Sequence, residues 1–126
     1  MKMEIKRQAA QPEYWFREGC HIIETANDGG DTTLSVARAR VESGVTTAWH
    51  RLDGREERYL IISGCGVVEL GEEFRGEVAA GDVVRIPAGT RQRISNTGKD
   101  DLIFFAVCTP PFVEESYAAE ENFGEK

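Results

Sequence analysis

The chain has 126 residues, of which 40% are hydrophobic and 29% are charged, and its formal net charge is −7. A chain of this length supports one hydrophobic core, and its composition excludes the disordered and membrane classes. A surface that binds nucleic acid needs a basic patch to neutralise phosphates, so the acidic balance argues against a nucleic-acid partner.

The N-terminal segment, Met1 to Gln11, is polar and is not followed by the apolar core of a signal peptide. No apolar run approaches the length of a membrane span, so no membrane partner is expected. We therefore expect a cytoplasmic protein. Residues 1–30 are predicted to form an N-terminal extension with one short edge strand, around His21 to Glu24.

Between residues 33 and 109, short apolar and β-branched runs alternate with turn signals such as Asp53-Gly54 and Gly81-Asp82. This alternation is typical of an all-β sandwich or barrel. The expected strands cover residues 33–41, 45–50, 57–62, 67–70, 74–78, 83–86, 91–95 and 102–108. After them, residues 112–126 are rich in glutamate and are predicted to form an acidic C-terminal tail or short helix, anchored by Phe112 and Tyr117.

The three cysteines are odd in number, far apart in the sequence and never spaced as a C-x-x-C pair. A disulfide framework or structural zinc site is therefore not expected. Cys65 and Cys108 are predicted to be small buried hydrophobic residues.

Side chains two residues apart in a strand share one face of the sheet. His50 thereby shares a face with Ala48, Glu57 shares one with Tyr59, and Gln92 shares one with Ile94. All three patterns are consistent with a barrel interior that contains His50, Glu57 and Gln92.

Two segments carry glycine, histidine, glutamate, proline and asparagine at fixed spacings. The first reads Gly44-VTTAW-His50-Arg51-Leu52-DGRE-Glu57-RYLIIS-Gly64, and the second reads Gly81-DVVRI-Pro87-Ala88-Gly89-TR-Gln92-RIS-Asn96. They resemble the paired motifs of the cupin superfamily, and the resemblance covers about residues 34 to 109. It implies an antiparallel double-stranded β-helix, or jelly-roll barrel, over residues 31–111. It also implies pairing as a homodimer.

In the metal-dependent members of that family, three histidines and a glutamate hold a divalent ion. Here Leu52 stands at the second histidine position and Gln92 at the third, which leaves His50, Glu57 and Gln92 as candidate metal ligands. An amide oxygen is a weaker donor than imidazole. The resemblance therefore implies one weakly held divalent metal ion, or none.

The candidate site residues each have two interpretations. His50 either acts as a ligand or acid–base group, or is a remnant of a lost metal site that is hydrogen-bonded in the barrel. Burial is expected to raise the pKa of Glu57, which suits a general base near neutral pH, although Glu56 competes with it for the same position. Gln92 either binds a ligand or lines the wall, and Tyr59 either orients a substrate or packs as wall.

Arg38 and Arg40 share one face of the 33–41 strand. If that face turns inward, the two guanidinium groups bind substrate by clamping a carboxylate. If it turns outward, they form a solvated or interfacial stripe.

These residues predict a cupin that binds a small molecule, with Glu57 and His50 as the catalytic pair of an isomerase, lyase or cyclase. The substrate classes considered are small organic acids, sugars and polyketide-like compounds. The alternative is a non-catalytic sensor or binding domain, favoured by the loss of two metal-ligand positions. A metal-dependent dioxygenase is disfavoured, because iron that activates oxygen needs stronger ligands than these.

Overall fold

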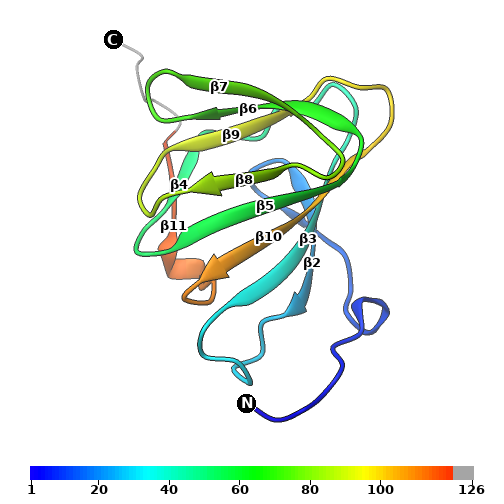
Figure 1. Cartoon of the computed structure of the whole chain (residues 1–126), viewed down its shortest axis with the longest axis vertical. Coiled ribbons are helices and arrows are strands. Elements are labelled where there is room, and N and C mark those ends of the chain that lie inside the picture. Colours follow the sequence, from blue (N-terminus) through cyan, green and yellow to red (C-terminus); the bar gives the residue numbers. More distant parts are fainter. Residues whose placement is uncertain (121–126) are drawn as a thin grey trace.

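Two antiparallel sheets face each other in the computed structural model, which describes residues 1–120 (Figure 1). One sheet contains, in spatial order, β1 (Tyr14–Phe16), β2 (Cys20–Ala26), β3 (Ser35–Val41), β10 (Leu102–Thr109), β5 (Glu56–Ser63) and β8 (Val83–Ile86). The other contains β11 (Tyr117–Ala119), β4 (His50–Leu52), β9 (Gln92–Asn96), β6 (Cys65–Leu70) and β7 (Phe74–Ala79). This arrangement confirms the predicted all-β jelly-roll barrel.

Two short 3-10 helices, η1 (Gln8–Ala10) and η2 (Glu114–Ser116), lie outside the sheets. Within residues 1–120, no helix combines the length and the hydrophobicity that crossing a bilayer requires.

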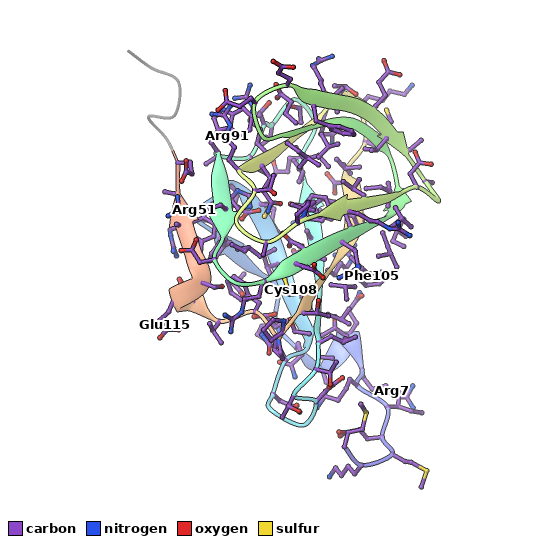
Figure 2. All side chains as sticks on the ribbon, turned by 60° about the vertical axis from the view of Figure 1, so that its left-hand side comes forward. Arg7, Arg51, Arg91, Phe105, Cys108 and Glu115 are labelled. Atoms are coloured by element: carbon purple, nitrogen blue, oxygen red, sulfur yellow. The ribbon has the colours of Figure 1, made fainter. Side chains whose placement is uncertain are left out.

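The core lies between the sheets, where alternate side chains of each strand meet (Figure 2). In β9, Gln92, Ile94 and Asn96 are all buried, as the two-residue period predicts. The Asn96 amide then donates to the backbone oxygens of Val41 (2.9 Å) and Asp100 (2.8 Å). The second motif therefore ends in a side chain that ties β9 to the opposite sheet.

Of the motif glycines, Gly64 stands where two backbone segments approach closely, whereas a Cβ at Gly44, Gly81 or Gly89 would meet nothing within 4 Å. Gly64 has φ +87°, and a Cβ there would lie 2.6 Å from the Asp101 oxygen. Cys65 follows it and is exposed, so its predicted burial was wrong, whereas Cys20 and Cys108 are buried and all three thiols are free. Cys65 begins β6 beside the loop at Gly98, outside the space between the sheets.

The strand expected over residues 45–50 is shorter, because β4 begins only at His50. The backbone N–H of Thr47 donates to the Ile94 oxygen (2.9 Å), and the Ile94 N–H donates to the Thr47 hydroxyl (3.0 Å). A side chain thus replaces part of the regular ladder.

Both flanking segments contribute strands to the barrel. β1 and β2 extend the six-stranded sheet, with β1 at its edge, and β11 pairs with β4 so that Ala119 lies opposite His50. Phe16 makes edge-to-face contacts with Phe112 and Tyr117, at centroid distances of 6.4 and 5.1 Å. Residues 121–126 of the expected acidic tail lie outside the described part of the chain.

Candidate functional site

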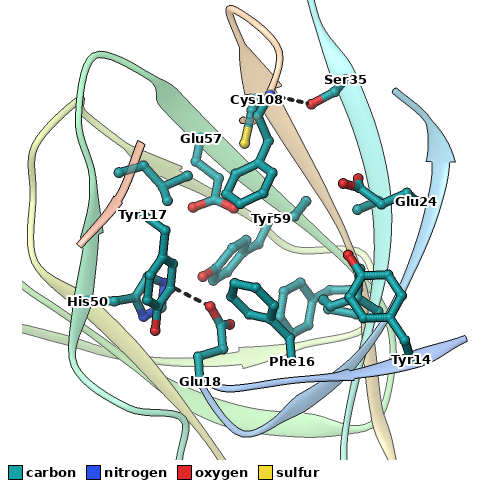
Figure 3. A pocket seen from close by; sticks show the side chains of 17 residues that line it. Tyr14, Phe16, Glu18, Glu24, Ser35, His50, Glu57, Tyr59, Cys108 and Tyr117 are labelled. Carbon is teal, nitrogen blue, oxygen red and sulfur yellow. Dashed lines mark hydrogen bonds and ion pairs between the residues drawn. The ribbon is translucent and has the colours of Figure 1, made fainter. Parts of the chain in front are cut away.

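A pocket of about 560 Å³, open mouth included, lies between the two sheets. His50 of the five-stranded sheet and Glu57 of the six-stranded sheet both line it, and they approach it from different walls (Figure 3). Tyr59 lines it as well, as predicted from its position two residues after Glu57. The barrel interior therefore brings the two predicted catalytic residues into one cavity.

The His50 ring is fixed on three sides. Its Nδ1 lies 2.8 Å from the Ala48 oxygen, and since a carbonyl only accepts hydrogen bonds, Nδ1 carries the hydrogen. The Tyr117 ring stacks on the imidazole at a centroid distance of 5.1 Å. Nε2 is left facing the Glu18 carboxyl, with 3.4 Å between Nε2 and Oε1.

Glu18 is the main site residue that the sequence did not reveal. It lies in the turn between β1 and β2, and its backbone oxygen accepts a 2.7 Å hydrogen bond from the N–H of Ala48, two residues before His50. Its side chain is 13% exposed and accepts a hydrogen bond from the Cys20 thiol (3.3 Å). Glu18 belongs to neither motif, so no spacing pattern connected it with His50.

His50 has the geometry to take up a proton at the pocket surface. With hydrogen on Nδ1, a neutral ring carries its lone pair on Nε2, the nitrogen that faces Glu18. A proton taken up on Nε2 would lie between the imidazole and the Glu18 carboxyl. His50, with Glu18 beside it, can therefore serve as an acid–base group.

Glu57, in contrast, is the group of the pocket that tends to keep its proton. Burial, and then the nearby charge of Glu18, raise its pKa to about 8, against hydrogen bonds from Gln92 and Cys108 that favour the charged form. Its Oε1 is buried and has no hydrogen-bond partner among residues 1–120. The upward shift follows the sequence prediction, but at pH 7 it leaves Glu57 protonated, so this carboxyl is a proton donor in its resting state and not the base that was expected.

Gln92 supports the pocket from behind. It is 1% exposed and does not line the cavity, whereas the Tyr59 hydroxyl donates to its amide oxygen at 2.5 Å. Its amide hydrogen-bonds the Glu57 carboxyl. Tyr59 also packs on Phe104 at a ring-centroid distance of 4.4 Å, so it is both a wall residue and a hydrogen-bonded one.

These residues do not fit the divalent ion that the resemblance allowed. The Gln92 oxygen is engaged by the Tyr59 hydroxyl, and Leu52 lines the pocket without a donor atom. Within residues 1–120, no group of three or more His, Cys, Asp and Glu side chains is placed to hold a metal ion.

Arg38 and Arg40 do not reach the pocket, which corrects their predicted role in substrate binding. Ala37 and Ala39 of the same strand line the cavity, so alternation turns the two arginines outward. Arg40 binds both oxygens of Glu13 at 2.9 Å, and Arg38 lies 3.5 Å from the same carboxylate.

The family model described as "Cupin domain" matches residues 37–108, so the chain belongs to the cupin family, as its motifs predicted. An uncharacterised protein of Methanocaldococcus jannaschii is 36% identical over 81 residues, and the match covers 64% of each chain. An oxalate-binding protein of Thermotoga maritima is 36% identical over 72 residues, which cover 56% of this chain and 58% of that protein. The chain thus spans less than two thirds of either relative.

The Streptomyces nucleoside dehydratase PAC13, solved with uridine, has the same fold. Its structure superposes with a TM-score of 0.79 at 19% identity, covering 96% of this chain and 93% of that one. At this identity the likeness shows the fold alone. The structural neighbours of this cupin nevertheless include enzymes.

Proposed function

We propose that the chain is an acid–base enzyme of the lyase or isomerase class that acts on a small hydroxylated molecule in the barrel pocket. One observation carries the proposal: the buried Glu57 carboxyl, whose pKa is raised to about 8 and whose Oε1 has no partner among the described residues, lies in the same pocket as His50 Nε2 and Glu18. Groups held in different protonation states in one site are the arrangement that acid–base catalysis requires. The nucleoside dehydratase with the same fold supports a reaction of this class.

The two walls divide the chemistry between them. In a dehydration, the His50–Glu18 pair takes a proton from a carbon next to a carbonyl, and the electron pair of that C–H bond forms the new C=C bond. The C–O bond breaks, and Glu57 protonates the leaving hydroxyl, which departs as water. Glu57 is then a carboxylate, and transfer of the proton gained by His50–Glu18, through solvent, restores the starting state.

A second candidate is a non-catalytic binding or sensor domain. Its supporting observation is that Leu52 and Gln92 occupy two of the four positions at which metal-dependent cupins carry ligands. It predicts reversible saturation of the same pocket without any change in the bound compound.

Two further features of the proposal concern the whole molecule. We propose a homodimer formed through the outer face of β5 and β8, where Leu60, Ile62 and Val83 are 36%, 48% and 58% exposed. Sedimentation of the wild type and of Ile62→Lys tests this, with a shift to monomer expected in the variant. The proposed location is the cytoplasm.

The reaction is tested by ¹H NMR in D₂O, with uridine, other nucleosides and free sugars as candidate substrates. Wild-type protein should cause deuterium incorporation at carbon or loss of water for at least one of them. His50→Gln and Glu57→Gln should each lose this activity, while Glu56→Gln, the exposed neighbour of Glu57, should keep it. Full activity in His50→Gln would overturn the proposal, and binding without conversion across the panel would favour the sensor.

A further inference from the structure

Among the acidic and basic side chains that line the pocket, all are carboxyl groups apart from the imidazole of His50. Glu18, Glu24 and Glu57 line it, and no lysine or arginine is among its lining residues in the described chain. The remaining wall is rich in aromatic rings, contributed by Tyr14, Phe16, Tyr59, Phe104, Phe112 and Tyr117. A site with this lining has nothing to neutralise an anionic ligand.

Two arginines near the pocket are bound elsewhere. The Arg17 guanidinium lies 4.4 Å above the Tyr117 ring, but its side chain is 53% exposed and is paired with Glu114 at 2.5 Å. Arg55 donates to the backbone oxygen of Pro111 at 3.0 Å. Neither charge is therefore available to a ligand inside the barrel without breaking an existing contact.

The pocket also contains unused hydrogen-bonding capacity. Glu57 Oε1 is buried and unpartnered, and its carboxyl is directed into the cavity between Tyr59 and Tyr117 (Figure 3). Glu24 enters the cavity beside Tyr14, and burial raises its pKa against a hydrogen bond from Asn27 that favours the charged form. A buried carboxyl oxygen without a partner is satisfied by a ligand with a hydroxyl or amine group, which can accept a hydrogen bond from the acid or donate one to it.

We infer that the pocket takes a ligand with an amine or other cationic nitrogen, accepts uncharged hydroxylated ligands less well, and rejects carboxylates and phosphates. The cation would be attracted by the carboxyl groups and by the faces of the aromatic rings. An anion would face like charge in a site that excludes water, which selects against it. This inference names the substrate class of the proposed enzyme and rests on the same pocket being its reaction site.

The inference separates this chain from a relative. The Thermotoga maritima protein that matches 72 of its residues is an oxalate-binding protein. Oxalate carries two negative charges, and here the only candidate metal donors do not fit an ion that could neutralise them. We therefore expect this pocket not to bind oxalate.

The test uses three ligands that share a phenyl ring and differ in the charge of their polar group, namely benzylamine, benzyl alcohol and benzoate, together with oxalate. Affinities are measured at pH 7 and constant ionic strength by titration of ¹⁵N-labelled protein, so that shifted resonances also locate the site. Benzylamine should bind most tightly and benzoate at least about tenfold more weakly, as expected for like charges brought together. Shifts should concentrate at residues such as Ala37, Ala39 and Ala106, which line the pocket.

Glu24→Gln should reduce the preference for benzylamine over benzoate, because it removes one pocket charge without changing shape. Glu77→Gln makes the same charge change on exposed β7, far from the pocket lining, and should leave the preference unchanged. Benzoate or oxalate binding in the pocket as tightly as benzylamine would overturn the inference. So would an equal effect of the two variants.

This outcome is independent of catalysis. If benzoate binds best but His50→Gln still abolishes deuterium incorporation, the acid–base proposal stands and the charge inference fails. If the affinity order holds in wild type and in His50→Gln, yet no compound is converted, the inference stands and the acid–base proposal fails.

Discussion

The fold shifts the pKa values of glutamates on the outer surface of the barrel and of glutamates in its pocket in opposite directions. Outside, Glu13 is bound by Arg40 and Glu69 by Arg93, and each guanidinium lowers the pKa of its partner. Inside, burial raises the pKa of Glu24 and raises that of Glu57 to about 8. The fold therefore favours the ionised carboxylate on the outer surface and disfavours it in the pocket.

Along β3, residues that line the pocket alternate with arginines that face outward. Ala37 and Ala39 line the pocket, and Arg38 and Arg40 between and after them point outward to Glu13. Arginine at either alanine position would have given the pocket acids a counter-charge. Leaving carboxyl groups buried without one destabilises the native state, and such uncompensated groups are characteristic of functional sites.

The largest effect is expected where the pocket acids and base meet a substrate. His50→Gln keeps a polar side chain but cannot take up a proton at the pocket, so turnover should fall by about 10²–10⁴-fold, the usual contribution of a general base. The measurement is deuterium incorporation in D₂O with the most active compound of the panel. The matched control, Glu56→Gln, should lie within about twofold of wild type because Glu56 is exposed. A similar loss of turnover in both variants would contradict a specific role of the pocket residues in the reaction.

The second effect concerns stability and pH. Because the folded state raises the pKa of Glu57 from 4.5 to about 8, it binds the proton more tightly than the unfolded chain does. Stability from this residue is therefore fully present below pH 4.5 and falls as the pH rises to about 8, by at most about 5 kcal/mol from a shift of this size.

Glu57→Gln removes this dependence, since the amide imitates the neutral acid at every pH. The variant should match wild type in denaturant unfolding near pH 4 and be more stable than wild type at pH 8. Glu69→Gln offers the contrast, because its pKa is lowered in the fold and its loss should not raise stability at pH 8. A Glu57→Gln protein that is less stable than wild type at pH 8 would contradict the predicted protonated state.

The barrel was predictable from the sequence because its determinants are local. Turn residues, alternation in strands and the spacing from Gly44 to Asn96 fix the strands, their faces and the positions of His50 and Glu57 in the interior. The same alternation did not decide which face of β3 turns into the barrel. Arg38 and Arg40 share one face and Ala37 and Ala39 share the other, and by alternation alone either face could line the pocket or lie exposed. Only the pairing of β3 with β2 and β10 decides it.

The pocket was less predictable, because several of its residues come from segments without a pattern. Glu18 reaches His50 from a turn of the N-terminal segment. Phe112 and Tyr117 reach the pocket from beyond the last predicted strand. Their positions depend on long-range contacts such as the Ala48 N–H to Glu18 oxygen bond. Periodicity and motif spacing carry no information about contacts of that kind.

Glu18→Gln should produce an intermediate effect within the pocket. The charge of Glu18 contributes to the raised pKa of Glu57, so its removal should lower that pKa below about 8. The high-pH limit of the rate profile, set by loss of the Glu57 proton, should then move to lower pH. ¹³C NMR of the Glu57 carboxyl follows the same titration without a substrate. An unchanged titration would show that the two carboxyl groups do not interact across the pocket.

The smallest effect is expected on the outer face. Arg40→Ala breaks the contacts with Glu13 and Asp101, but these side chains are partly solvated, and surface pairs of this kind contribute about 0.2–1 kcal/mol. Since the pKa of Glu13 is lowered in the fold, its contribution is present at neutral pH and is lost as the pH falls through the acidic range. Chemical denaturation at pH 7 in low and high salt should therefore show a small loss of stability that salt removes, with turnover unchanged. A large loss of turnover in Arg40→Ala would mean that the outer face influences the pocket, because the polar partners of the Arg40 side chain in the described chain, Glu13 and Asp101, do not line it.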